Sequence, residues 1–442
     1  MSSGNRRMFD SAASLVASTV VTSGLGFLYW VLAARVAPVE QVAAATAIVS
    51  AMTLLLNVGQ FGFGTMLIAE GTGRVRRMGP LIAASLLVVV FASSALTVVF
   101  VVVVRMVDST LARSLAGWPA VLALIAGVAL GAAALVLDQA LIGLSLSPVQ
   151  LYRNVVFATS KLVLCWGAAM AVELVTAGTI LWAWVAGSAL SLVAVLVDLR
   201  RRGRRVGFVP RPSALSGLGV RTADHNTVNL AQMLPRLGLP LLAALVLAEA
   251  DYAAFFAAWM IASFLYMVPT HLSTAMFAIA VGDRTALAAR LRAGLVVLLG
   301  PGVLGAFVIG GFASAWMGIF GPDYRIAATG LAVLAAGYLP CVLKELYIAV
   351  ERVEGRLRVA GFVLLGTAVV ELAGGVVGGM VAGIQGAAIG YVLGTCVLCP
   401  VYLRSIGKAL AANHQTQRDP RPPRLGLGPG PATSPGTWMA AP

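Results

Sequence analysis

The chain has 442 residues, of which 60% are hydrophobic and only 11% carry a charge. Soluble globular domains have about 45–50% apolar and about 25% charged residues, so this composition excludes an ordinary soluble protein and predicts a polytopic membrane protein. A formal net charge of +14 would suggest a nucleic-acid partner if the protein were soluble. In a membrane protein, lysine and arginine collect in the loops of one side, so we expect no nucleic-acid partner.

Twelve apolar stretches approach or exceed the ~20 residues that a helix needs to cross a bilayer. The first follows MSSGNRRMFD without a cleavage-site pattern, so we expect a retained anchor and not a signal peptide. The predicted helices lie at about 10–33, 42–69, 80–104, 117–145, 149–172, 178–199, 222–247, 252–280, 289–313, 327–350, 357–380 and 384–406. The sequence therefore predicts an all-α protein with twelve transmembrane helices.

The basic residues predict the orientation. With a cytoplasmic N-terminus, 23 of the 31 lysines and arginines fall in cytoplasmic segments, four in outer loops and four within spans. Such an imbalance follows the positive-inside rule. We therefore expect both termini to be cytoplasmic, in a bacterial cytoplasmic membrane.

A basic stretch, RRRGRRVGFVPRPSALSGLGVR at 200–221, interrupts the apolar chain after the sixth span. We interpret it as a cytoplasmic linker between an N-terminal six-helix lobe at 1–199 and a C-terminal six-helix lobe at 222–406. The Pro/Gly-rich tail at 407–442 is expected to be disordered. The exits of spans one and seven, RVAPVEQ and AEADYAA, are similar, which favours two pseudo-symmetric lobes around a central cavity.

Polar residues in the first lobe mark candidate sites, because ionisable groups at membrane depth are costly and are usually functional. Span two carries Asn57 and Gln60. Asp138 and Arg153 lie at comparable depth on either side of the short turn between spans four and five, so they could pair; Arg153 could also extend to the inner interface. Asp138 is a counter-ion to Arg153 or Lys161, or a site for a coupling ion. Lys161 is too deep to reach the interface and is a candidate for the substrate path.

Span seven carries a polar stripe at i, i+4, i+7 and i+11, made of His225, Asn229, Gln232 and Arg236. This spacing places all four side chains on one side of a helix. An arginine near the middle of a spanning helix costs about 2.5–3.5 kcal/mol on insertion scales, so Arg236 should face protein or water. We therefore predict a water-filled path between the lobes, with His271 of span eight at a depth similar to that of His225.

The last spans carry further ionisable groups. Lys344 and Glu345 of span ten are expected to reach the inner interface by extending their side chains. Glu371 lies near the middle of span eleven, before glycines at GxxxG spacing that indicate helix packing. Two interpretations of Glu371 stand: a protonated side chain packed on the glycine-rich face, or a site for a coupling ion.

Features of an enzyme are absent from the sequence. The outer loops are too short to hold a catalytic base or a metal, and no phosphate-binding loop or metal-ligating histidine set occurs. Cys396 and Cys399 have redox-motif spacing but sit in an apolar helix, where small buried side chains are the simpler interpretation. We expect no catalytic residues, no metal and no cofactor.

Three segments resemble one known family. The exit of span one, ARVAPVEQVAAATAI, resembles the R-x-x-G-P-E-x-(Y/F)-G turn of Wzx-type polysaccharide flippases, in the multidrug/oligosaccharidyl-lipid/polysaccharide exporter superfamily, although Ala37 and Ala43 stand where glycine is usual. LLNVGQFGFGTMLIA resembles the glycine-rich second helix of that family, and AEADYAAFFAAWMIASFLYMVP its turn between helices seven and eight.

This resemblance implies two six-helix lobes, a cavity between helices one, two, seven and eight, and alternating access. The implied substrate is an isoprenoid-pyrophosphate-linked saccharide that moves from the inner to the outer leaflet for polysaccharide biosynthesis. Membrane lipids, a coupling ion (proton or sodium) and polysaccharide-assembly enzymes would be its partners. Basic side chains, namely Arg236, Lys161, Arg153, His225 and His271, would meet the pyrophosphate, while Asn57, Gln60, Asn229 and Gln232 would meet sugar hydroxyls.

Two other functions remain open. A cation-coupled multidrug exporter of the same superfamily would need an acidic binding site, whereas the deep charges here lean basic. A membrane-embedded glycan polymerase or transferase would need a longer outer loop. Neither the saccharide, the energy source nor the oligomeric state follows from the sequence.

Overall fold

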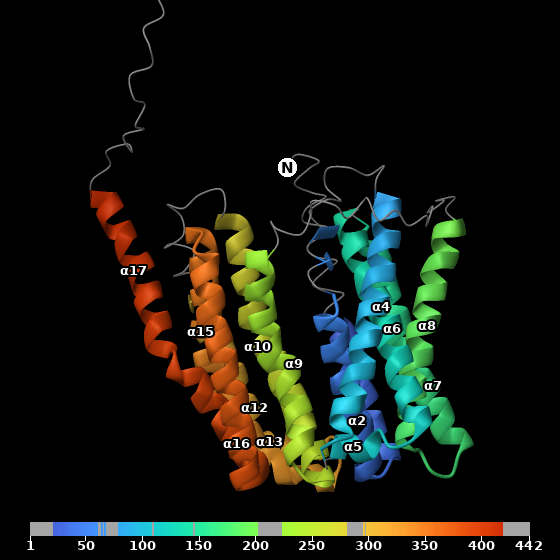
Figure 1. Cartoon of the computed structure of the whole chain (residues 1–442). Coiled ribbons are helices and arrows are strands. Elements are labelled where there is room, and N and C mark those ends of the chain that lie inside the picture. Colours follow the sequence, from blue (N-terminus) through green and yellow to red (C-terminus); the bar gives the residue numbers. More distant parts are fainter. Residues whose placement is uncertain are drawn as a thin grey trace, which may run out of the picture.

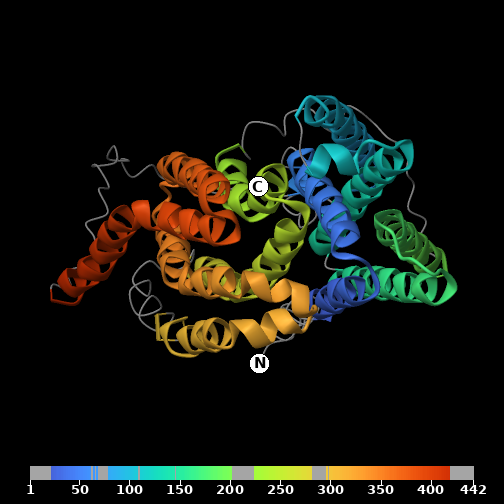
Figure 2. The same ribbon diagram turned by 90° about the horizontal axis from the view of Figure 1, so that it is seen from below.

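The computed structural model describes residues 21–60, 63–64, 66–67, 78–107, 110–144, 146–201, 223–280, 295–296 and 298–418, without the side chains of 110, 223–227, 229, 274–280 and 412–418. Within these residues every regular element is helical (Figure 1). The helices form two lobes that lie side by side, one from each half of the chain (Figure 2).

The N-terminal lobe contains the first half of the described helices. Its members are Val21–Val36, α2 (Val39–Val58), α4 (Met78–Val104), α5 (Thr110–Ser114), α6 (Trp118–Gly143), α7 (Ser147–Ala171) and α8 (Ala177–Arg201). The C-terminal lobe contains α9 (Ala223–Val246), α10 (Glu249–Ala280), α12 (Pro301–Gly311), α13 (Ala313–Gly318), the 3₁₀ helix η4 (Pro322–Ala327), α14 (Ala328–Ala336), α15 (Tyr338–Glu354), α16 (Leu357–Val397) and α17 (Cys399–Arg418).

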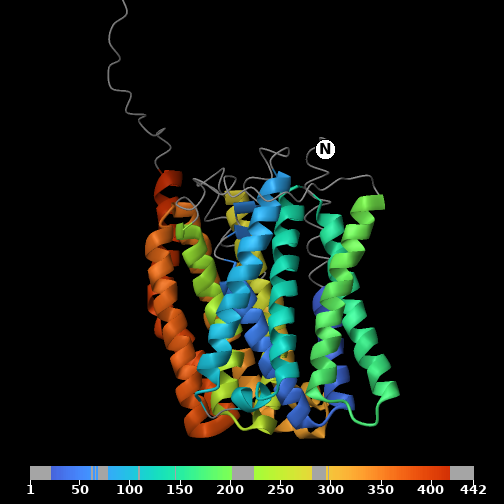
Figure 3. The same cartoon turned by 45° about the vertical axis from the view of Figure 1, so that its right-hand side comes forward.

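Eight helical runs among the described residues are long and apolar enough to span a bilayer, and three shorter apolar helices lie at Val21–Val36, Leu230–Val246 and Pro301–Gly311. One of the eight runs, α16, turns back at Ala382 and Gly383, and α17 follows its second limb. The long helices run side by side through one slab (Figure 3). The predicted fold class, an all-α polytopic membrane protein of two lobes, is confirmed.

Glycines explain the return of the chain within α16. Ala382 and Gly383 leave the helical conformation, and Gly383 adopts a φ of 59°, which glycine tolerates. A Cβ on Gly374 would meet the backbone of Gly390, and a Cβ on Gly378 would meet that of Gly386. The GxxxG pattern therefore packs the two halves of α16 against each other with their backbones in contact, as its spacing predicts.

The lobes contact each other through α2, which packs against α9 and α10. At the end of the bundle where α10 begins, Arg35 donates hydrogen bonds to the carbonyls of Gly318 and Ile319 at 3.0 and 2.8 Å. Arg113 pairs there with Glu249 at 3.2 Å. The ribbons of the two lobes meet at this end and diverge toward the other (Figure 1).

The last helix extends beyond residue 407, where the sequence analysis placed the start of a disordered tail. Helix α17 continues to Arg418, because the segment SIGKALAANHQTQR is rich in helix-forming alanine, leucine, lysine and glutamine. The remainder of the predicted tail, the linker at 202–221 and the first half of span one lie outside the described residues.

The α16 hairpin gives a first prediction. Replacing Gly378 by leucine should force the two backbones apart, because overpacking costs about 1–3 kcal/mol or more. We expect the thermal midpoint of the detergent-purified protein to fall by at least about 5 °C. Gly366→Leu on the same helix is the control, since Gly366 is exposed and no neighbour approaches its Cβ position. Equal midpoints for the two variants would show that the glycine contact does not hold α16 together.

Candidate functional site

The N-terminal lobe contains a buried ion pair between α6 and α7. Arg153 donates from Nε and Nη2 to the two carboxylate oxygens of Asp138, each at 2.6 Å, and the two residues are only 5% and 6% exposed. Arg153 also contacts the hydroxyl of Ser191 on α8 at 3.4 Å and the side-chain oxygen of Asn154. The expected pair forms, and it holds Arg153 inside the lobe and away from the interface.

Lys161 lies in the same lobe without a carboxylate partner among the described residues. Its ammonium sits over the rings of Trp184, Phe157 and Tyr29, at 3.7, 4.7 and 4.9 Å from their centroids, and the residue is 4% exposed. Aromatic faces attract a desolvated cation through their quadrupoles. Lys161 is therefore enclosed by rings inside the lobe.

The C-terminal lobe contains a second buried ion pair. Lys344 of α15 donates to Oε1 of Glu371 on α16 at 2.7 Å, and Glu371 is fully buried. The expectation that Lys344 reaches the inner interface is wrong, because α16 supplies a carboxylate at its depth. Oε2 of Glu371 has no hydrogen-bond partner among the described residues.

Glu345, which was also expected to reach the interface, is buried in the C-terminal lobe. Its carboxylate accepts hydrogen bonds from Gln232 of α9 at 3.1 Å and from Thr270 of α10 at 3.1 Å. Arg352 donates in turn to the side-chain oxygen of Gln232 at 3.1 Å. Neutral donors thus hold a carboxylate that forms no ion pair within the described part of the chain.

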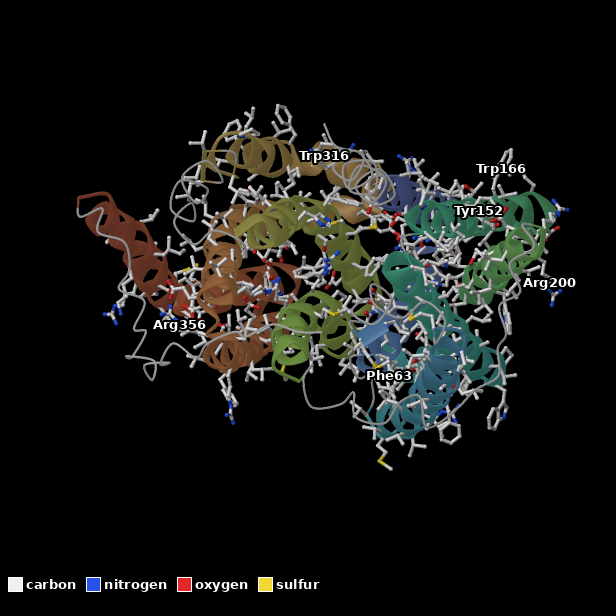
Figure 4. The ribbon with its side chains drawn as sticks, turned by 90° about the horizontal axis from the view of Figure 1, so that it is seen from above. Phe63, Tyr152, Trp166, Arg200, Trp316 and Arg356 are labelled. Carbon is white, nitrogen blue, oxygen red and sulfur yellow. The ribbon has the colours of Figure 1, made fainter. Side chains whose placement is uncertain are left out.

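Lys344, Glu345, Gln232 and Thr270 line a small, partly open cavity inside the C-terminal lobe. Polar side-chain atoms gather within the ring of α9, α10, α15 and α16 (Figure 4). The lining residues are Gln232, Pro235, Arg236, Trp259, Ser263, Tyr266, Met267, Thr270, Cys341, Lys344, Glu345 and Tyr391. All of them belong to one lobe, so this cavity lies within the C-terminal lobe, whereas the predicted path runs between the lobes.

Arg236 lines this cavity and could bind an anionic ligand. Its side chain is exposed although it sits in the middle of a spanning helix, and its guanidinium forms no hydrogen bond or ion pair with a described residue. Of the other charged side chains in the lining, Lys344 is paired with Glu371, and Glu345 accepts hydrogen bonds from neutral donors. A guanidinium offers planar, paired donors that suit a phosphate or a carboxylate.

The other predicted site residues lie elsewhere. Gln232 joins Arg236 in the cavity, whereas the side chains of His225 and Asn229 are outside the described residues. His271 is exposed on α10 and is not part of the lining.

The amides of span two belong to the N-terminal lobe. Asn57 donates to the carbonyl of Thr53 on its own helix at 2.7 Å. Nε2 of Gln60 is buried without a hydrogen-bond partner in the described residues. The predicted substrate-path residues are therefore divided between the two lobes.

Sequence reasoning missed the roles of Glu345, Thr270 and Arg352 in this network. The clustering of Lys344, Glu345, Glu351 and Arg352 on one apolar helix was a usable signal, since charges of that density need partners within the protein. Among the described residues, no group of three or more histidine, cysteine or acidic side chains could hold a metal ion.

Comparison with known proteins identifies the fold. No family model matches the chain, and neither does any curated protein. A solved multidrug resistance MATE family transporter of the MOP superfamily, in its inward-facing conformation, is 14% identical, with a TM-score of 0.63, over 90% of this chain and 96% of that one. A transporter of the same description in an outward-facing conformation has a TM-score of 0.54 and 14% identity, over 92% of this chain and 96% of that one. A MATE structure in a straight conformation has a TM-score of 0.56 and 13% identity, over 93% of this chain and 97% of that one. At these identities the likeness shows a MATE-like two-lobed fold.

The Lys344 and Glu371 pair gives a second prediction. Glu371→Gln should lower the free energy of unfolding by about 3–5 kcal/mol, because it leaves a buried ammonium without its counter-ion. Replacing both partners, with Lys344→Met and Glu371→Leu, should recover most of that loss. Arg113→Ala breaks the exposed pair with Glu249 and should cost no more than about 1 kcal/mol. Denaturant titration in detergent gives these values, and a double variant as unstable as Glu371→Gln would contradict the ion-pair explanation.

Proposed function

We propose that this protein is an alternating-access transporter of a bacterial cytoplasmic membrane, with both termini cytoplasmic. The two-lobed MATE-like fold supports the proposal, because solved transporters of similar fold are described in an inward-facing and in an outward-facing conformation. No catalytic machinery enters the proposal, so the protein moves its substrate without changing it.

The first candidate substrate is an isoprenoid-pyrophosphate-linked saccharide, flipped from the inner to the outer leaflet. The observation that carries it is the exposed guanidinium of Arg236, which lines an intramembrane cavity and forms no ion pair with a described residue. A pyrophosphate needs desolvated cationic partners to leave water, and guanidinium groups are the strongest available. Gln232 and Thr270 would meet sugar hydroxyls, while the lipid chain stays among the membrane lipids.

The second candidate is a cation-coupled multidrug exporter, and the comparisons favour it over the first. The solved structures of similar fold are described as multidrug resistance or MATE transporters. Glu345 also lines the cavity without an ion pair, beside Trp259, Tyr266 and Tyr391. A carboxylate among aromatic rings is a suitable environment for an amphipathic cation.

Ion coupling by Asp138 and Glu371 is part of the proposal for either substrate. Each carboxylate is held by a basic partner, Arg153 or Lys344, so a proton or sodium ion would bind in competition with that partner. Polysaccharide-assembly enzymes are proposed partners only for the flippase.

A third prediction separates the two substrates in proteoliposomes. If the protein is a flippase, Arg236→Ala should slow the translocation of a fluorescent polyprenyl-pyrophosphate sugar by roughly 10- to 100-fold, the effect of losing a charge-assisted hydrogen bond. Arg236→Lys should retain part of the activity. Arg358→Ala, an exposed arginine outside the cavity lining, is the control.

The exporter makes the opposite forecast in the same vesicles. Glu345→Gln should abolish ethidium efflux driven by a proton or sodium gradient, and Arg236→Ala should leave efflux intact. If wild-type protein moves the pyrophosphate sugar and Arg236→Ala moves it equally fast, Arg236 has no part in recognition.

A fourth prediction concerns Lys161. Lys161→Met keeps the length of the side chain and removes a buried charge that has no carboxylate partner, so we expect stability equal to or above that of the wild type. Translocation should nevertheless fall if Lys161 contributes to the substrate path. If Lys161→Met raises stability and leaves translocation unchanged, Lys161 has a structural role in the lobe and no role in transport.

A further inference from the structure

Helix α9 contains two prolines, Pro235 and Pro240, within its membrane-spanning part. Proline has no backbone N–H, so the carbonyl four residues earlier loses its helical hydrogen bond. Pro240 therefore frees the carbonyl of Arg236. A buried carbonyl without a partner destabilises a membrane protein wherever water does not reach it.

A side chain from the neighbouring helix supplies the missing donor. The indole Nε1–H of Trp259 on α10 donates to the carbonyl of Arg236 at 3.2 Å. Trp259 is 4% exposed, and its ring is held edge-on by Tyr391 at 4.9 Å and by Tyr266 at 6.2 Å, between centroids. The packing of the Trp259 ring therefore fixes the direction of its N–H toward the carbonyl.

Apart from the backbone hydrogen bonds of α9 itself, this contact is the one hydrogen bond between Arg236 and a described side chain. The guanidinium forms no hydrogen bond or ion pair with a described residue, so its position is determined by the backbone that carries it. Both Trp259 and Arg236 line the cavity. The hydrogen bond thus joins the backbone of Arg236 to the indole of Trp259, and both residues line the same cavity.

We propose that Trp259 is a positioning residue for anion binding: it replaces the helical hydrogen bond removed by Pro240 and so holds the segment of α9 that presents Arg236 to the cavity. The inference rests on the proposed function, since it takes Arg236 as the group that meets the pyrophosphate. It adds a role for Trp259 and Pro240 that depends on a single shared carbonyl.

The shared carbonyl allows a double-variant test. Trp259→Phe keeps an aromatic ring and removes the N–H, while Pro240→Ala restores a backbone N–H to the same carbonyl. Binding of farnesyl pyrophosphate to the purified full-length protein is measured by calorimetry, and thermal midpoints are measured on the same samples. Trp316→Phe on α13 is the matched control, since Trp316 is half-buried and does not line the cavity.

We expect Trp259→Phe to weaken binding of the probe roughly tenfold and to lower the thermal midpoint, as loss of a partner for a buried polar group would. In the Pro240→Ala background the same substitution should weaken binding by less than about threefold, because the restored N–H already satisfies the carbonyl. Trp316→Phe should leave the affinity unchanged.

Two results would overturn the proposal in distinguishable ways. If Arg236→Ala weakens binding but Trp259→Phe has no effect, or has the same effect with and without Pro240→Ala, the positioning role is wrong and the anion site stands. If Arg236→Ala leaves binding unchanged, the anion site fails and the positioning role fails with it. Should Trp259→Phe alone not fold, the double variant with Pro240→Ala still decides, because rescue of folding and of affinity supports the shared carbonyl and absence of both rejects it.

Discussion

A charged group inside a membrane protein must find a partner, and this constraint organises the interior of both lobes. Arg153 and Lys344 each meet a carboxylate at 2.6–2.7 Å on an adjoining helix. Lys161 meets three aromatic faces, and Glu345 meets neutral donors. Arg236 alone among these deep cations has neither a carboxylate nor an aromatic partner within the described residues. It shares its cavity with Lys344, but only Arg236 is exposed. Water entering that cavity would hydrate the guanidinium and so lower the cost of placing a charge in a spanning helix.

Hydrophobic period, length and glycine spacing were enough to predict much of the fold. The apolar membrane helices follow from segment length, and the close packing within α16 follows from the GxxxG pattern. The contact between Asp138 and Arg153 was also accessible, because a short turn joins their helices and sets both at one depth. In each of these cases the partners are neighbours along the chain, so the local sequence carries the information.

The partners that could not be predicted come from helices that are distant in sequence. The ring of aromatic side chains around Lys161 combines Tyr29, Phe157 and Trp184, and depth along one helix does not reveal which neighbour faces it. Lys344 was assigned to the interface for the same reason, since its distance from the membrane surface was known but the carboxylate of Glu371 beside it was not. Gln232 and Arg236, the members of the polar stripe on α9 whose side chains are described, line the same cavity.

The distribution of strong and weak polar contacts bears on how such a molecule could alternate between two states. The buried ion pairs lie within a single lobe, and breaking one costs about 3–5 kcal/mol. Between the lobes the described residues form no buried ion pair: the contacts of Arg35 with the carbonyls of Gly318 and Ile319 and of Arg113 with Glu249 are exposed. The hydroxyls of Ser50 and Tyr252 form a buried hydrogen bond across the lobes at 3.3 Å, but both groups are neutral. An exposed ion pair contributes about 0–1 kcal/mol and a neutral hydrogen bond about 0.5–1.5 kcal/mol. Lobes that move as rigid bodies would therefore keep every costly pair and exchange only inexpensive contacts, together with apolar packing such as that of Trp30 on Phe256. Since the cavity with Arg236 also lies within one lobe, its charges would move with that lobe, and a bound anion would keep its guanidinium partner throughout the transition.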